Sequence, residues 1–337
     1  MPDSSARSFP SIAIIGSGSF GTALAYLLGE RCERVTMIGR DNHVAQEINA
    51  KHQNPKYLSG VQLHDHVKAS TNLAEAANHH LIIFSVPTSA TRSTAQELAA
   101  IGTTAALVSS AKGIERNTGD RMSQILREIF PKNPLAVISG PNHAEEIACR
   151  LATCAVIGSR DHELASSLQK LFTFPHFRTY TSTDIAGIEL GGAIKNIYAI
   201  AAGIAAGLGL GDNAIAALVT RALSEMTRLG IALGGQRETF TGLSGVGDLI
   251  ATCFSHHSRN HRVGLALGQG RPLDEAVASI GMIAEGVPNT LSIYEAARAA
   301  HVSTPIIDAV YSILYQDRPA ALALRDLLSR DPRPEND

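Results

Sequence analysis

A run of spaced glycines between two apolar segments most narrows what this chain can fold into. Ile12–Ile15 is continuously apolar, as in a buried parallel strand, and Gly16, Gly18 and Gly21 follow it directly. The Ala- and Leu-rich segment Thr22–Gly29 then predicts a helix. In such a unit the first glycine permits a tight turn, the second lets backbone approach a pyrophosphate, and the third brings helix and strand together. The spacing predicts a dinucleotide site, with a glycine-rich turn of another α/β fold as the alternative.

A second candidate strand, Val35–Ile38, ends just before Arg40 and Asp41. A carboxylate at this point binds the ribose 2′-hydroxyl of NAD, whereas an arginine accommodates the 2′-phosphate of NADP. Arg40 therefore indicates a site that accepts NADP, with NAD not excluded. The alternative is that Arg40 is a solvated loop charge.

Further apolar runs alternate with helical patterns through the first half of the chain, which predicts a doubly wound, mostly parallel α/β sheet of the Rossmann type. The runs are Leu81–Phe84, Ala105–Val108, Ala136–Ile138 and Cys154–Ile157, and the helical patterns include Ser89–Ala100 and Gly119–Phe130. Ligands of such sheets lie beyond the carboxyl ends of the strands. The loops 86–88, 110–113 and 139–143 are therefore candidate ligand contacts. Lys112 in the second loop could meet an anionic substrate, or could be an ordinary surface lysine.

The second half has helical periodicity, and its longest apolar run, Ile185–Leu210, contains a single basic residue, Lys195. The run predicts a buried core helix rather than a membrane span. Burying an ammonium costs several kcal/mol unless it is paired or its pKa falls. Lys195 is thus either a functional group or a core lysine that reaches the surface or a carboxylate. We expect a dinucleotide-binding domain over residues 1–183, an all-α domain over 184–330 and a disordered tail over 331–337.

One glycine-spaced stretch, Thr239–Ile250, interrupts the helical pattern, and Asp248 in it opens an apolar helical turn. Ser258, Arg259 and Asn260 follow about ten residues later, among several histidines. Such a cluster of donors suits a phosphate, because a guanidinium binds that group in bidentate fashion. The alternative is that Asp248 caps a helix and that the later residues form a solvated loop.

Composition limits the classes of partner and compartment. A formal net charge of −2 gives no basic excess for nucleic acid or for stable insertion into an anionic membrane. The 4 cysteines form no CxxC pair, which suits a reducing cytosol. The histidines form no HExxH motif, so no metal site is predicted. The start from Met1 to Pro10 lacks the apolar core of a secretory signal, so we expect a cytoplasmic protein.

Six motifs, taken together and in order, resemble bacterial NAD(P)-dependent glycerol-3-phosphate dehydrogenase from about Ile12 to Tyr315. They are Gly16–Thr22, Ala111–Gly113, Ser139–Ala144, Gly191–Asn196, Gly242–Asp248 and Ser258–Asn260. The resemblance implies a Rossmann domain and an all-α C-terminal domain like that of 6-phosphogluconate dehydrogenase. It also implies interconversion of dihydroxyacetone phosphate and sn-glycerol 3-phosphate with NADP or NAD, which feeds glycerophospholipid synthesis.

The resemblance also assigns roles to residues. Lys195 would be the proton donor and acceptor. The substrate would be bound by Lys112, Gly140, Asn142, Lys195, Asp248, Ser258, Arg259 and Asn260. The cofactor would contact the glycine segment through Gly16, Gly18, Ser19, Phe20 and Gly21, and other segments through Arg40, Lys112, Ala144, Arg259, Ile283 and Glu285. Phe20 stands where tryptophan is common in the family. His143 stands where a bulky apolar residue is often found, and adds a titratable group near the expected site.

The expected mechanism requires an acid near the carbonyl, because hydride transfer builds negative charge on its oxygen. Burial, with Lys112 nearby, would lower the pKa of Lys195 toward neutral pH, and Asp248 would hold this ammonium or a substrate hydroxyl. A related two-domain reductase acting on a hydroxyacid, ketopantoate or an imine is an alternative. A non-catalytic NAD(P)-binding redox sensor is another. A homodimer is the default assembly for such enzymes.

Overall fold

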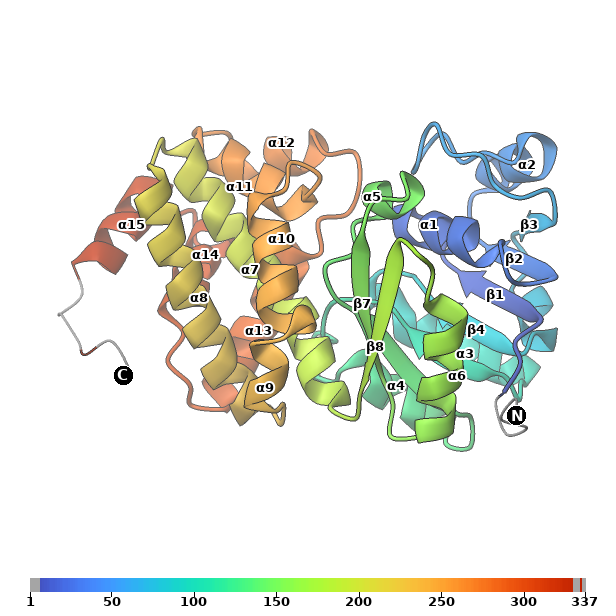
Figure 1. The fold of residues 1–337 in the computed structure, drawn as a ribbon. Coiled ribbons are helices and arrows are strands. Elements are labelled where there is room, and N and C mark those ends of the chain that lie inside the picture. Colours follow the sequence, from blue (N-terminus) through green and yellow to red (C-terminus); the bar gives the residue numbers. More distant parts are fainter. Residues whose placement is uncertain (1–6, 330–333, 335–337) are drawn as a thin grey trace.

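The computed structural model describes residues 7–329 and 334, and the predicted disordered tail 331–337 lies, apart from Pro334, outside them. A sheet with its covering helices forms one half of the molecule, and helices alone form the other (Figure 1). The sheet belongs to the N-terminal part of the chain, whose last strand ends at Ser182. The first long helix of the helical half begins at Ile185.

Among the described residues, the sheet has 8 strands in the order β3-β2-β1-β4-β5-β6-β7-β8, and all neighbours are parallel except β6 and β7. Strand order reverses around β1, where Ile12 pairs with Val35 on one side and Leu81 on the other. A crevice for ligands is expected at such a reversal. The strands are β1 (Ser11–Ile15), β2 (Arg34–Ile38), β3 (Val67–Ser70), β4 (Leu81–Phe84), β5 (Ala106–Ser109), β6 (Leu135–Ser139), β7 (Thr153–Gly158) and β8 (Phe177–Ser182).

Helices cover the sheet and build the second half of the molecule (Figure 1). Those of the first half are α1 (Ser19–Leu28), α2 (Asn42–Lys51), η1 (Leu73–Asn78), η2 (Thr88–Ala90), α3 (Thr91–Ile101), α4 (Met122–Ile129), α5 (Ala144–Ala148) and α6 (His162–Phe172). Those of the second half are α7 (Ile185–Gly207), α8 (Asp212–Ala232), α9 (Arg237–Phe240), η3 (Leu243–Gly247), α10 (Asp248–Phe254), α11 (Arg259–Gly268), α12 (Leu273–Ala278), α13 (Gly286–Ala299), α14 (Pro305–Tyr315) and α15 (Ala320–Leu328).

The predicted doubly wound α/β sheet and the helical second half are confirmed, and all six strands expected from apolar runs are present. The edge strands β3 and β8 were missed. β8 alternates buried Phe177 and Thr179 with exposed Arg178 and Tyr180, so it lacks a continuous apolar run. An edge strand needs only one apolar face, and its signal is correspondingly weaker.

The glycine segment has the geometry that its spacing predicts. Gly16 has a φ of +119°, and a Cβ there would lie 2.3 Å from the carbonyl oxygen of Ser85 at the end of β4. A Cβ on Gly21 would lie 2.0 Å from the carbonyl oxygen of Gly16, so this glycine lets α1 pack closely. A Cβ on Gly18 would meet no atom of another described residue within 4 Å, its two chain neighbours aside. Gly18 therefore faces open space, where a ligand can approach the backbone.

Helix α7 is the core of the helical half. It is apolar enough by length and composition to span a membrane, but 89% of its most apolar window is buried inside the protein. It packs against α11 at backbone distance, because a Cβ on Gly203 would lie 2.1 Å from the carbonyl oxygen of His261. Ser123 and Arg121, at the start of α4, hydrogen-bond the buried Glu189 of α7. These contacts tie α7 to the sheet half.

We predict that Gly21→Ala lowers the free energy of unfolding by about 1–3 kcal/mol, because the new methyl group overpacks the contact between α1 and Gly16. Urea unfolding followed by circular dichroism would measure the change. Gly18→Ala is the matched control, since its methyl group meets open space, and it should leave stability within about 0.5 kcal/mol of wild type. Equal stability of the two variants would contradict the packing role of Gly21.

Candidate active site

A cleft of about 1,020 Å³ lies between the two halves of the molecule. Most of the residues that were expected from the sequence to bind a ligand line this cleft. They are Gly16, Gly18, Ser19, Phe20, Arg40, Lys112, Asn142, Ala144, Lys195, Ser258, Arg259, Asn260, Ile283 and Glu285. Gly21, Gly140 and Asp248 lie behind this lining. The cleft thus brings together segments that are far apart in the chain.

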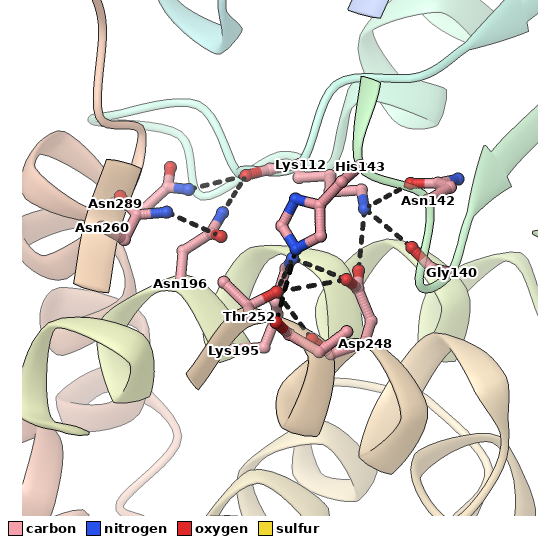
Figure 2. A network of polar contacts seen from close by, with 11 residues as sticks. Lys112, Gly140, Asn142, His143, Lys195, Asn196, Asp248, Thr252, Asn260 and Asn289 are labelled. Carbon is pink, nitrogen blue, oxygen red and sulfur yellow. Dashed lines mark hydrogen bonds and ion pairs between the residues drawn. The ribbon is translucent and has the colours of Figure 1, made fainter. Parts of the chain in front are cut away.

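Lys195 projects from α7 into a buried polar cluster (Figure 2). Its Nζ donates to Oδ1 of Asp248 at 2.6 Å and to Oγ1 of Thr252 at 2.5 Å. Thr252 in turn donates to the carbonyl oxygen of Asp248 at 2.6 Å. An ammonium has three hydrogens. Two of them have acceptors among the residues that the structure describes, so one is left for a group in the cleft.

Lys112 shares the carboxylate of Asp248 with Lys195. Its Nζ donates to Oδ2 of Asp248 at 2.8 Å, and to the carbonyl oxygen of Gly140 and Oδ1 of Asn142 at 3.0 Å each. All three hydrogens of this ammonium therefore have protein acceptors. In this arrangement Lys112 acts on the cleft chiefly through its charge. Gly140 and Asp248 act through the lysines that they hold.

Burial and charge set the protonation of the cluster. Desolvation lowers the pKa of Lys195 to about 8; Asp248 opposes this change, and the Lys112 ammonium adds to it. Desolvation works to raise the pKa of Asp248, but the two ammoniums outweigh it and hold that pKa below its usual value. The carboxylate therefore stays charged at neutral pH, and Lys195 can exchange a proton close to that pH.

Asparagine side chains link the loop after β5 to the helical half. Asn289 donates to the backbone oxygen of Lys112 at 2.7 Å, and Asn196 donates to the same oxygen at 3.3 Å. Asn260 donates to Oδ1 of Asn196 at 2.9 Å and accepts from the backbone N–H of Gly286 at 2.9 Å. Figure 2 shows Asn196, Asn260 and Asn289 beside the lysine cluster. They fix the backbone that carries Lys112.

Ser258, Arg259 and Asn260 form a cluster with hydrogen-bond donors available to a ligand. Ser258 is the N-cap of α11, and its Oγ accepts from the backbone N–H of His261 at 3.1 Å. Within the described part of the chain, the Arg259 guanidinium has no hydrogen bond or ion pair, although Glu145 and Glu285 lie near enough to favour its charge. Burial lowers the pKa of Arg259 without making it neutral at ordinary pH. Such a cation, at a helix N-terminus in a cleft, suits a phosphate.

The other end of the cleft fits a dinucleotide. Its wall includes the open backbone at Gly18, the start of α1 and the exposed Arg40. Loop 281–285 reaches across from the helical half, and Oε1 of Glu285 accepts from the backbone N–H of Thr88 at 3.3 Å.

Beside Lys112, Nδ2 of Asn142 is buried without a hydrogen-bond partner among the described residues, which leaves a donor for a bound molecule.

His143 joins the two halves at the edge of the site. Its Nε2 lies 3.4 Å from the carbonyl oxygen of Ala251, and its ring lies 6.3 Å from that of His257. Burial lowers the pKa of His143, and the nearby Lys195 lowers it further. The imidazole is therefore largely neutral at pH 7 and adds no third cation beside the two lysines.

Sequence reasoning missed several contributors to the site. Thr252 lies four residues after Asp248, and this helical spacing could have indicated that it shares Lys195. Asn289 carried no local signal, because it comes close only through the packing of α13. Lys56 and Tyr57 also line the cleft, and the backbone oxygen of Tyr57 accepts from Oγ of Ser19 at 2.7 Å.

Family models describe nearly all of this chain. Residues 11–165 match the NAD-dependent glycerol-3-phosphate dehydrogenase N-terminus, and residues 184–325 match the C-terminus of the same family. Among curated proteins, the chain is 44% identical to the glycerol-3-phosphate dehydrogenase [NAD(P)+] of Clostridium tetani, covering 96% of this chain and 93% of that one. The enzyme of the same name from Halothermothrix orenii is also 44% identical, covering 96% of each chain.

Solved structures agree in fold over the whole length. The glycerol-3-phosphate dehydrogenase of Coxiella burnetii is 35% identical with a TM-score of 0.92, covering 96% of this chain and 99% of that one. A ketopantoate reductase from Ralstonia eutropha is 16% identical with a TM-score of 0.60, covering 93% of this chain and 99% of that one. The second similarity shows the two-domain fold alone. The chain therefore belongs to the NAD-dependent glycerol-3-phosphate dehydrogenase family.

Proposed function

We propose that this protein interconverts dihydroxyacetone phosphate and sn-glycerol 3-phosphate, using NADPH or NADH, and so supplies glycerophospholipid synthesis. The family and the lysine cluster support this reading. Residues 1–183 would bind the cofactor, and residues 184–330 would hold the substrate against it. A cytoplasmic homodimer without stable membrane insertion and without nucleic acid is part of the same proposal, and analytical ultracentrifugation would test the assembly.

The cofactor, when bound, supplies or accepts a hydride. The open backbone at Gly18 and the N-terminus of α1 would hold its pyrophosphate, and Arg40 would face its ribose. Ser19 and Phe20 line the same wall. Ala144, Ile283 and Glu285 also line the cleft and would close it around the cofactor. The protein's contribution at this end is placement and exclusion of water.

Lys195 would supply the proton to the carbonyl oxygen during reduction and take it back during oxidation. The single observation that carries this proposal is the third hydrogen of its ammonium, which is left for the cleft while Asp248 and Thr252 hold the other two. A donor with a pKa of about 8 can both give and accept a proton near neutral pH. Lys112 would add positive charge where the oxygen becomes negative.

Arg259 would hold the phosphate of the substrate together with the N-terminus of α11, Ser258 and Asn260. The phosphate does not react. Its binding energy can fix the carbonyl carbon in place for hydride transfer. A related reductase acting on a substrate without phosphate would not need this free guanidinium. A redox sensor would not need the proton donor at Lys195.

We predict that Lys195→Met reduces kcat by about 10²–10⁴-fold, the usual range for loss of a general acid. Methionine fills the volume of the lysine stem, so cofactor binding measured by NADPH fluorescence should stay within about twofold of wild type. Lys68→Met, on the exposed side of β3, is the control for loss of one lysine. Near-normal turnover of Lys195→Met with dihydroxyacetone phosphate would rule out Lys195 as the acid.

The pH dependence should follow Lys195. Reduction requires the protonated amine, so kcat/KM for dihydroxyacetone phosphate should fall as pH rises through about 8, and oxidation should fall as pH drops through the same value. The charge of Asp248 raises the pKa of Lys195. Asp248→Asn should therefore move both limbs to lower pH, by about 1–3 units. A shift to higher pH, or none, in the rate profile would contradict this coupling.

We predict that Arg259→Ala lowers kcat/KM for dihydroxyacetone phosphate by about 10–100-fold, mainly through KM, because a charged hydrogen bond to phosphate is lost. Activity with unphosphorylated dihydroxyacetone should change far less. Arg262→Ala removes an exposed arginine one turn along α11 and should leave both activities unchanged. An Arg259→Ala enzyme that still prefers the phosphorylated triose to the wild-type extent would refute the phosphate role.

A further inference from the structure

Arg40 is not the only cation at the end of β2. Lys56, from the loop after α2, lines the same cleft, and its Nζ lies 2.7 Å from Oδ2 of Asp41. The other carboxylate oxygen of Asp41 caps α2 by accepting from the backbone N–H groups of His43 and Val44 at 3.0 and 3.3 Å. The acidic residue expected to favour NAD is thus already neutralised by a lysine.

The loop that carries Lys56 is anchored on both sides. Asn54 is fully buried, and its Nδ2 donates to the carbonyl oxygen of Ser17 at 2.9 Å and to Oγ1 of Thr22 at 2.7 Å. On the other side of Lys56, the backbone oxygen of Tyr57 accepts from Ser19 at 2.7 Å. The ammonium also lies 5.3 Å from the centre of the Tyr57 ring. Lys56 is therefore placed by the glycine segment itself, unlike a lysine on a free surface loop.

The charges of Arg40, Asp41 and Lys56 decide which ligand this end of the cleft can accept. Without Lys56, the negative Asp41 would repel a 2′-phosphate, which carries up to two negative charges. With it, Arg40 and Lys56 leave an excess of one positive charge, and Arg40 has no hydrogen bond or ion pair to any residue that the structure describes. Ion pairing with Asp41 raises the pKa of Lys56, which keeps it charged.

We propose that Lys56 is a second specificity-determining residue of the cofactor site, which binds the 2′-phosphate of NADP together with Arg40 and otherwise neutralises Asp41. The same three residues, Arg40, Asp41 and Lys56, then serve both cofactors. With NADP, the two cations hold the phosphate; with NAD, Oδ2 of Asp41 accepts from the ribose 2′-hydroxyl. This inference deepens the proposed function, because it rests on NADP or NAD binding at this end of the cleft.

The test is direct binding of nucleotide fragments, which does not depend on turnover. Isothermal titration calorimetry with adenosine 2′,5′-bisphosphate and with 5′-AMP compares ligands that differ by the 2′-phosphate. We expect Lys56→Gln to weaken binding of the bisphosphate about tenfold and to leave 5′-AMP within about twofold. Lys56→Arg keeps the charge and should retain the wild-type preference. Lys51→Gln, which removes an exposed lysine from nearby α2, is the control and should change neither.

Steady-state kinetics should change in the same sense. The ratio of kcat/KM for NADPH to that for NADH should fall about tenfold in Lys56→Gln and in Arg40→Ala. It should rise in Asp41→Asn, because the amide still caps α2 but no longer repels the phosphate. Equal weakening of both nucleotides by Lys56→Gln, or no weakening, would overturn the inference. If the enzyme failed to reduce dihydroxyacetone phosphate while the calorimetric difference persisted, only the proposed reaction would fall.

Discussion

The buried carboxylate of Asp248, shared by two ammonium groups, is the interaction on which the rest of the site depends. Lys195 and Lys112 contact its two oxygens at 2.6 and 2.8 Å, and the carboxylate is only 2% exposed. Removing one partner from a buried ion pair leaves an uncompensated buried charge, which is strongly destabilising. Within the described part of the chain, the arrangement leaves net positive charge beside the cleft and one hydrogen of Lys195 without a protein acceptor. The positive charge and the available hydrogen both suit a substrate carbonyl oxygen that becomes negative.

The fold brings these three groups together from distant segments. Lys112 follows β5, Lys195 lies within α7, and Asp248 begins α10. Close packing makes the geometry rigid, because α7 meets η3 at backbone distance: a Cβ on Gly191 would lie 2.4 Å from the carbonyl oxygen of Ser244. The glycines around Lys195 therefore serve packing, and the packing sets the position of Asp248. At the far end of the cleft, the loop that carries Lys56 is held to the glycine segment by hydrogen bonds of Asn54 and of the Tyr57 backbone.

Local sequence patterns predicted much of this structure. Continuous apolar runs identified the central strands, and the spacing at Gly16, Gly18 and Gly21 corresponds to a strained turn, an open backbone and a close contact. The edge strands β3 and β8 were missed because one solvated face breaks the apolar run. Asn289 was missed because a hydrogen bond between distant elements leaves no pattern in the neighbouring residues. Thr252 was missed although its helical spacing from Asp248 was a usable signal.

By itself the sequence determined the central strands, the helical second half and the glycine-spaced turn after β1, and it showed that Lys195 is an unusual charge in an apolar helix. These properties depend on residues close together in the chain, through periodicity and the conformational freedom of glycine. Only the tertiary structure decided which carboxylate pairs with Lys195, that the hydrogens of Lys112 are fully used, and that Lys56 neutralises Asp41. The physical reason is that a pKa or an ion pair depends on distance and desolvation in space, which the linear order of residues does not record.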